Sequence, residues 1–109
     1  MLYNKFSNDS VILKNYFQRS VDSKMRFNIL YLAKYQCHYC KVTLNDENTH
    51  IDHAIPRSRG GLTITANLRA SCIQCNLEKG DKTEQEYIAW KTKQQSFFLL
   101  LQLLQNNKK

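Results

Sequence analysis

The segment Cys37-His38-Tyr39-Cys40 is followed, 31 residues later, by Cys72-Ile73-Gln74-Cys75. Each Cys-x2-Cys pair places two thiols on one tight turn, and four thiolates suit the tetrahedral coordination of Zn²⁺. The alternative is two disulfides, but residues 1–10 lack the basic and apolar regions of a secretory signal. We therefore expect reduced thiols, in the cytoplasm or another intracellular reducing compartment. The expected site is structural zinc, closed to substrate, held by Cys37, Cys40, Cys72 and Cys75.

The composition is that of one small globular domain, residues 1–109. Apolar residues make up 42% of the chain, and 12 residues are aromatic. A chain of this length buries only about 60–68% of its unfolded surface, so an added staple such as a metal is expected. The longest apolar run is far shorter than the roughly 20 residues that cross a bilayer. This excludes a membrane-spanning protein.

The charge predicts a polyanionic partner. The formal net charge is +7, which favours nucleic acid, although basic charge also suits an anionic membrane surface or solubility alone. Residues 37–56 have a net negative charge, because they contain one basic residue, Lys41, and three acidic residues, Asp46, Glu47 and Asp52. A basic frame therefore surrounds a small acidic centre that contains histidine.

The hydrophobic pattern predicts short elements around this centre. Apolar spacings of three and four predict an amphipathic helix over residues 23–35. Alternating residues 49–55 predict a strand that stops at Pro56, and a second extended piece is expected near residues 68–70. The Gly60-Gly61 pair marks a loop. One helix is expected from about residue 73 to just before Gly80, and another over residues 83–105, in one part or two, with a start that is similar to a capping box.

Between the cysteine pairs lies the segment His50-Ile51-Asp52-His53-Ala54-Ile55-Pro56-Arg57-Ser58-Arg59-Gly60-Gly61, followed by Asn67-Leu68. In the second pair, Cys75 is followed directly by Asn76 and, after two further residues, by Lys79-Gly80-Asp81-Lys82. Over about residues 26–82 this combination resembles the HNH endonuclease family, in particular the subgroup stapled by two Cys-x2-Cys knuckles. The resemblance implies an α+β fold with a small ββα-metal (His-Me finger) core, a structural zinc held by a pair of cysteine knuckles, and flanking helices, including a C-terminal helical extension over residues 83–109.

The resemblance also implies the activity and the roles of the central residues. It predicts hydrolysis of DNA phosphodiester bonds with one catalytic divalent ion. His53 matches the general base that takes a proton from water, and Asp52 and Asn76 match the ligands of the ion. Oxygen ligands suit Mg²⁺ or Mn²⁺. Asn67 matches the residue that ties the loop to the first strand and so orients the base.

Four further residues are candidate contacts to nucleic acid: His50, Arg57, Arg59 and Lys79. The three cations are expected beside the centre, where they can bind phosphates, but a solvated basic surface is the alternative for each. His50 shares a strand face with Asp52 and is expected to contact the phosphate or to support the ion site, with an exposed bystander as the alternative. His38 and Tyr39 are interpreted as turn residues outside the site.

Two other functions compete with the nuclease. A zinc-stapled nucleic-acid-binding module without cleavage would keep the charge and the knuckles, and a zinc ribbon for protein contacts would explain the cysteines alone. For the C-terminal segment Tyr87-Ile88-Ala89-Trp90 with Phe97, Phe98, Leu101 and Leu104, packing into the core competes with a homodimer formed through this helix. The DNA endonuclease is favoured, because it alone explains the central residues.

Overall fold

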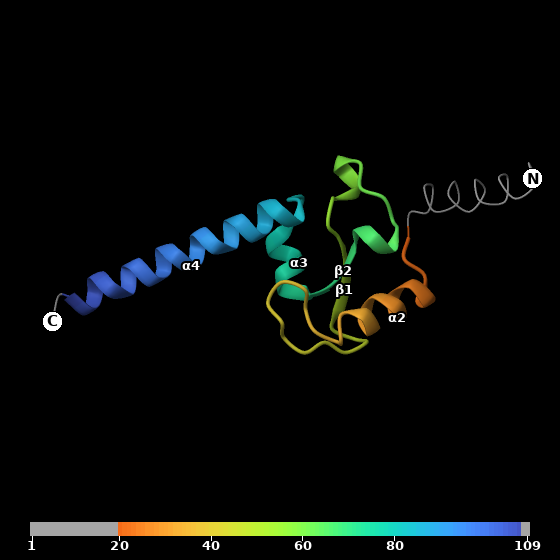
Figure 1. The fold of residues 1–109 in the computed structure, drawn as a ribbon, viewed down its shortest axis with the longest axis horizontal. Coiled ribbons are helices and arrows are strands. Elements are labelled where there is room, and N and C mark those ends of the chain that lie inside the picture. Colours follow the sequence, from red (N-terminus) through yellow and green to blue (C-terminus); the bar gives the residue numbers. More distant parts are fainter. Residues whose placement is uncertain (1–19, 108–109) are drawn as a thin grey trace, which may run out of the picture.

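The computed structural model describes residues 20–107 (Figure 1). The expectations about residues 1–10 and about the last two residues of the helical extension lie outside this range. In chain order the helices and strands are α2 (Ser23–Leu32), β1 (Thr49–His53), β2 (Leu68–Cys72), α3 (Ile73–Lys79) and α4 (Glu84–Asn107). Two 3-10 turns, Arg57–Arg59 and Thr65–Asn67, lie between the strands.

The two strands form an antiparallel sheet that leads directly into α3. The register pairs Thr49 with Cys72 and His53 with Leu68. The second strand therefore ends on the third cysteine, which is also the N-cap of α3, and its thiol accepts a hydrogen bond from the Cys75 amide. This strand–strand–helix unit with clustered cysteines confirms the predicted α+β fold class.

The first helix, α2, is shorter than predicted. Asp22 caps its start by accepting a hydrogen bond from the Met25 amide at 2.8 Å, as a short acidic side chain does at an N-terminus. The helix ends at Leu32 and not near residue 35, because Lys34 and Tyr35 take positive φ angles. The chain then folds into the first Cys-x2-Cys turn, which Gln36 and Thr43 close with an antiparallel bridge.

The core is small and lies between the sheet, α2, the first knuckle and the start of α4. Its buried members come from every one of these segments, and they include two of the cysteines: Ile29, Leu30, Cys37, Leu44, Leu68, Ala70, Cys75 and Tyr87. Because thiols form part of the core itself, a metal bound to them would join the knuckles and the hydrophobic interior into one unit.

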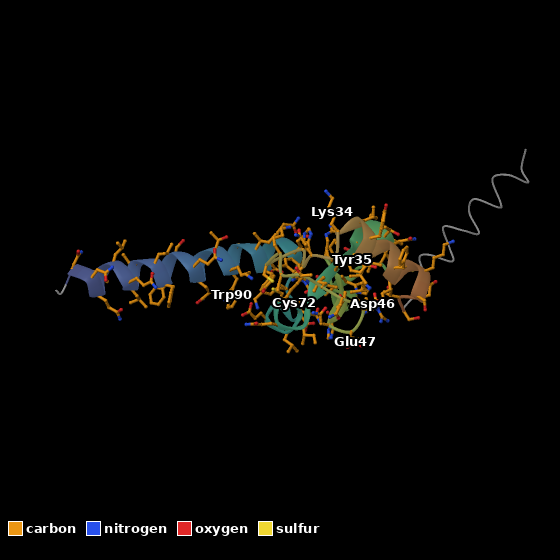
Figure 2. All side chains as sticks on the ribbon, turned by 90° about the horizontal axis from the view of Figure 1, so that it is seen from below. Lys34, Tyr35, Asp46, Glu47, Cys72 and Trp90 are labelled. Atoms are coloured by element: carbon orange, nitrogen blue, oxygen red, sulfur yellow. The ribbon has the colours of Figure 1, made fainter. Side chains whose placement is uncertain are left out.

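The last helix, α4, starts with a capping box and then leaves the body of the molecule (Figure 1). The Glu86 amide donates to the Thr83 hydroxyl, and the Thr83 amide donates back to the Glu86 carboxylate. Tyr87 is buried, and just beyond Trp90, which Figure 2 labels near the base of the helix, Lys91 still reaches the Cys75 sulfur. Residues 92–107 are exposed. The helix runs unbroken to Asn107.

The outer half of α4 corrects one interpretation. Core packing is confirmed for Tyr87, which is buried. It is wrong for residues 97–104, because the side chains of Phe97, Phe98, Leu101 and Leu104 are 41–60% exposed. Within residues 20–107, no helix combines the length and the apolar character that crossing a membrane requires.

Candidate active site and metal centre

Asp52 lies at the centre of the site, near the end of β1. Its side chain points inward and is only 7% exposed. The Tyr39 hydroxyl donates to Oδ2 at 2.6 Å, and the Lys79 ammonium lies 3.2 Å from Oδ1. A buried carboxylate needs such donors, because moving an unpaired carboxylate out of water costs several kcal/mol of folding free energy. Each carboxylate oxygen thus has one protein donor.

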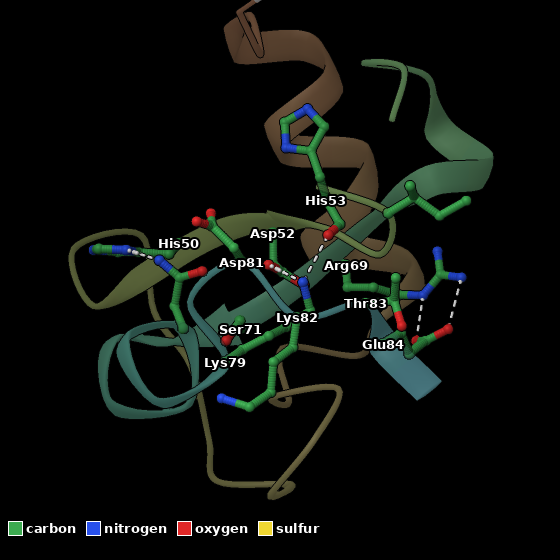
Figure 3. Close-up of polar contacts among 12 residues, drawn as sticks. His50, Asp52, His53, Arg69, Ser71, Lys79, Asp81, Lys82, Thr83 and Glu84 are labelled. Atoms are coloured by element: carbon green, nitrogen blue, oxygen red, sulfur yellow. Dashed lines mark hydrogen bonds and ion pairs between the residues drawn. The ribbon is translucent and has the colours of Figure 1, made fainter. Parts of the chain in front are cut away.

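Lys79 differs from the expectation drawn from the sequence. It is the last residue of α3, and its side chain is 1% exposed. Besides Asp52, its ammonium donates to the backbone oxygen of His53 at 2.8 Å (Figure 3). An ammonium so buried does not present itself to a phosphate in solvent. Lys79 therefore holds α3 against β1 and balances the charge of Asp52, which corrects its assignment as a nucleic-acid contact.

His53 follows Asp52 and points to the other side of the strand, where its Nε2 lies 2.9 Å from the hydroxyl of the buried Thr63. Burial lowers the pKa of His53 below its usual 6.5, and the positive charge of Arg57 lowers it further. Asp52 acts in the opposite direction without reversing the shift. The imidazole is therefore neutral at pH 7 and can accept a proton. The sequence offered no signal for Thr63, which lies ten residues away.

Asn76 sits on α3 facing the strand. Its amide nitrogen lies 3.0 Å from Nδ1 of His50, a contact that Figure 3 marks at the His50 ring. With the amide in this orientation, the NH₂ group donates to an unprotonated Nδ1 and the carbonyl oxygen faces away from His50. His50 thus supports Asn76 in this structure, which is one of the roles considered for it.

Asn67 ties the loop to the end of β1. Its side-chain oxygen accepts from the Ile55 amide at 2.9 Å, and its NH₂ group donates to the carbonyl oxygens of Ile55 and Leu62 at 3.0 and 2.9 Å. The Ala54 amide also donates to the Asn67 carbonyl. These bonds hold the chain immediately after His53, so that the loop between the strands cannot move independently of the histidine.

A pocket of about 250 Å³ opens over these groups. The polar residues in its walls include Asp52, His53, Arg57, Asn76 and Lys79. A second carboxylate, that of Asp81, also lines it and was not predicted as a site residue. Oxygen donors from a carboxylate and an amide are what hard divalent cations prefer. A pocket of this size accommodates one such ion with part of its water shell.

The two arginines of the loop are placed differently. Arg57 is exposed and lines the pocket, where it can meet a phosphate. Arg59 is also exposed, but its guanidinium pairs with the Glu86 carboxylate at the start of α4. The capping contacts of Thr83 and this arginine lower the pKa of Glu86 to about 2. Arg59 is thus partly engaged in docking α4.

The four cysteines gather at the other end of the sheet. Their sulfur atoms all lie within 4.8 Å of one another, and the Sγ atoms of Cys40 and Cys72 are 3.8 Å apart. Four sulfurs at about 2.3 Å from a tetrahedral zinc stand about 3.8 Å apart. The distances fit a metal such as zinc, and none of the four thiols forms a disulfide.

The electrostatics of the cysteine cluster also favour a bound cation. Burial raises the pKa of Cys37, but backbone amides that donate to its sulfur outweigh burial and lower it to about 6. Burial raises the pKa of Cys75 to about 12, and the neighbouring thiols contribute to this. Four thiolates this close repel one another unless a metal neutralises them.

Two residues between the first pair of cysteines make contacts that the sequence did not indicate. Tyr39, interpreted as a turn residue outside the site, donates to Asp52, so that interpretation is corrected. His38 pairs with Glu84 at 2.5 Å, and Arg69 reaches the same carboxylate oxygen at 2.9 Å (Figure 3). The first knuckle therefore contacts both the central carboxylate and the start of α4.

Comparison with known proteins agrees with this geometry. Residues 37–90 match the model of a family described as HNH endonuclease. The chain carries an HNH endonuclease domain. Over 47 residues the HNH domain is 43% identical to the CRISPR-associated endonuclease Cas9 of Corynebacterium diphtheriae, a match that covers 42% of this chain and 4% of that protein. This chain thus corresponds to a small part of that relative.

The HNH domain also resembles a solved structure, the Type II-C Cas9 enzyme from Actinomyces naeslundii. The TM-score is 0.55 at 24% identity, covering 78% of this chain and 10% of that one. At this identity the likeness supports the fold. The structural similarity covers 78% of this chain, a larger share than the 42% covered by the sequence match.

Proposed function

We propose that this HNH domain hydrolyses DNA phosphodiester bonds, with one Mg²⁺ or Mn²⁺ ion held by Asp52 and Asn76 and with His53 as the general base. The observation that carries the proposal is the pocket in which a buried carboxylate, an oriented amide and a neutral histidine meet. When bound, the ion stabilises the negative charge that develops on the scissile phosphate and on the leaving 3′ oxygen.

The residues of the chain perform the remaining work. His53 accepts a proton from the water that attacks phosphorus, the P–O3′ bond breaks, and the leaving 3′ oxygen takes a proton from solvent. The products are a 5′-phosphate and a 3′-hydroxyl. Asn67 holds the backbone that carries His53. Arg57, which lines the pocket, is the residue best placed to bind the substrate phosphate electrostatically. Arg59 and His50 remain proposed contacts to more distant parts of the nucleic acid.

The cysteine cluster is proposed to bind Zn²⁺, which stabilises the fold without taking part in the chemistry. A site with four protein ligands leaves no position for water or substrate. This assignment requires reduced thiols and thus a reducing, intracellular compartment.

The test is nicking of supercoiled plasmid by purified, zinc-loaded protein. We expect cleavage with added Mg²⁺ or Mn²⁺, none in EDTA, and none by His53→Ala, whose zinc content and DNA affinity should match the wild type. Cleavage by His53→Ala at the wild-type rate would contradict the assigned base. DNA binding without any metal-dependent cleavage would favour the non-catalytic binding module.

We also propose that the domain forms a homodimer through the outer half of α4. Seven large apolar side chains are exposed within residues 97–104, and no residue from Gln94 to Asn107 carries a charge. A helical end without tertiary contacts is marginal in water, and a stable interface needs about 800 Å² from each partner. A second copy of the same apolar segment would cover these side chains.

Sedimentation velocity at tens of micromolar distinguishes the two states. The wild type should sediment as a dimer, and a Leu101→Lys, Leu104→Lys double variant should sediment as a monomer with unchanged zinc content. A monomeric wild type would overturn the dimer without affecting the proposed chemistry.

A further inference from the structure

Tyr39 links the two ends of the sheet. It lies between Cys37 and Cys40 of the first knuckle, yet its hydroxyl donates to Oδ2 of Asp52 at 2.6 Å. A tyrosine hydroxyl is protonated at neutral pH and therefore acts as the donor to the carboxylate. One side chain thus joins the cysteine cluster to the pocket.

The position of Tyr39 is itself fixed by the knuckle. The amides of the flanking residues Cys37 and His38 donate to Val42 and Ala70 at 2.9 and 2.8 Å, which anchors the turn to itself and to β2. The Tyr39 ring packs edge-on against that of Tyr87, with centroids 5.0 Å apart. Because Tyr87 is fully buried in the core, the Tyr39 ring has a rigid neighbour.

The contacts of Asp52 divide between its two oxygens. Tyr39 holds Oδ2 and Lys79 holds Oδ1, so the plane of the carboxylate is set from both sides. A carboxylate oxygen has a second lone pair, and Asp52 lines the pocket. Loss of the hydroxyl would free Oδ2 and allow the carboxylate to rotate about its terminal bond.

We propose that Tyr39 is a positioning residue that couples the cysteine knuckle to the active site, its hydroxyl holding Asp52 in the orientation that binds the divalent ion. The inference rests on the proposed function, in which Asp52 is a ligand of that ion. Partners that orient a metal ligand commonly change metal affinity or activity about 10–100-fold when removed. The knuckle would then organise the site in addition to stabilising the fold.

The test is Mn²⁺ binding to zinc-loaded protein, measured by electron paramagnetic resonance for the wild type, Tyr39→Phe, Tyr87→Phe and Asp52→Asn. Tyr87→Phe is the matched control, because it removes another buried hydroxyl that donates to a carboxylate, that of Glu78 at 2.7 Å. We expect Tyr39→Phe to bind Mn²⁺ about 10-fold or more weakly, with full zinc content. Tyr87→Phe should bind as the wild type does.

Cleavage supplies a second measurement that a general loss of structure would not reproduce. Tyr39→Phe should need about 10-fold or more Mn²⁺ for half-maximal nicking and should approach the wild-type rate at saturation. A lowered rate at saturation with an unchanged Mn²⁺ requirement would overturn the inference.

The outcomes separate the two proposals. If the wild type binds no Mn²⁺, or if Asp52→Asn binds it equally well, the proposed metal site fails and the inference fails with it. If Asp52→Asn loses binding while Tyr39→Phe keeps it, only the role of Tyr39 is overturned. Equal weakening in Tyr39→Phe and Tyr87→Phe would also overturn it, since any buried hydroxyl would then have the same effect.

Discussion

One ring nitrogen of His53 has a hydrogen-bond partner within the protein. Its Nε2 lies 2.9 Å from the Thr63 hydroxyl. If Nε2 carries the proton and donates to Thr63, Nδ1 holds the lone pair that accepts a proton from water. Thr63 would thereby select the reactive tautomer, a role that its buried position supports.

The first prediction concerns this pair. Thr63→Val keeps the volume of the side chain but removes the partner of Nε2, so the saturated nicking rate should fall about 10-fold, a part of the 10²–10⁴ that a general base contributes. Thr63→Ser should restore most of the rate. The exposed Thr65 provides the control, because Thr65→Val should cut normally. An unchanged rate for Thr63→Val would contradict the assigned tautomer.

The second prediction concerns pH. Burial and the charge of Arg57 lower the pKa of His53 below 6.5, and the base works only when it is neutral. The nicking rate at saturating metal and DNA should therefore rise with pH and level off, with its midpoint below pH 6.5. Arg57→Gln removes one cause of the shift and should move the midpoint upward. A wild-type midpoint above this value would count against His53 as the base.

Among the structural elements, the loop between the strands depends on two adjacent glycines for different reasons. Gly60 has a φ of +88°, a conformation that L-residues avoid, but no atom lies close to the position of its missing side chain. A Cβ on Gly61 would lie 1.6 Å from the Ile55 carbonyl oxygen. Gly61 therefore permits the close approach that Asn67 secures on the same carbonyl.

The third prediction compares the two glycines. Gly60→Ala should lower the free energy of unfolding by about 1 kcal/mol through backbone strain. Gly61→Ala should cost more, about 1–3 kcal/mol, because the loop must move away from the end of β1. It should also slow nicking, since that movement disturbs the segment after His53. Denaturant unfolding of both variants decides the order, and a greater cost at Gly60 would refute this account.

For the molecule as a whole, the described part of the chain has a small hydrophobic core to which the cysteines contribute. Two of the eight buried core members are cysteines, and α4 leaves the body after its first turns (Figure 1). Zinc bound to four thiolates contributes on the order of 10–16 kcal/mol. This is comparable to the whole stability of a small domain, about 5–15 kcal/mol.

The fourth prediction follows from this comparison. Removal of zinc with a strong chelator should abolish the cooperative thermal transition and most of the helical circular dichroism. Added Zn²⁺ should restore both, and added Mg²⁺ should restore neither. A chelated protein that keeps its transition would show that the core alone is sufficient.

Features that depend on neighbouring residues or on fixed spacing follow from the amino-acid sequence alone. The two Cys-x2-Cys pairs and the Thr83–Glu86 capping box were predictable, because turn geometry and hydrogen bonds between near neighbours depend on local residue types. The first strand was also predicted, but it ends at His53 and not at Ile55, because the Ala54 and Ile55 amides donate to Asn67. The family motif also placed Asp52 and His53 on the first strand and Asn76 on the helix, where the structure has them.

Which side chains meet across the sheet emerges only from the folded molecule. Tyr39 reaches Asp52 over 13 positions, Thr63 reaches His53 over ten, and Lys79 becomes buried against both strand residues. The exposure of the outer half of α4 was also not predictable from the sequence, because its apolar pattern fits a buried core as well as an interface. Such contacts depend on how packed elements approach one another, and residue types along one chain do not specify that geometry.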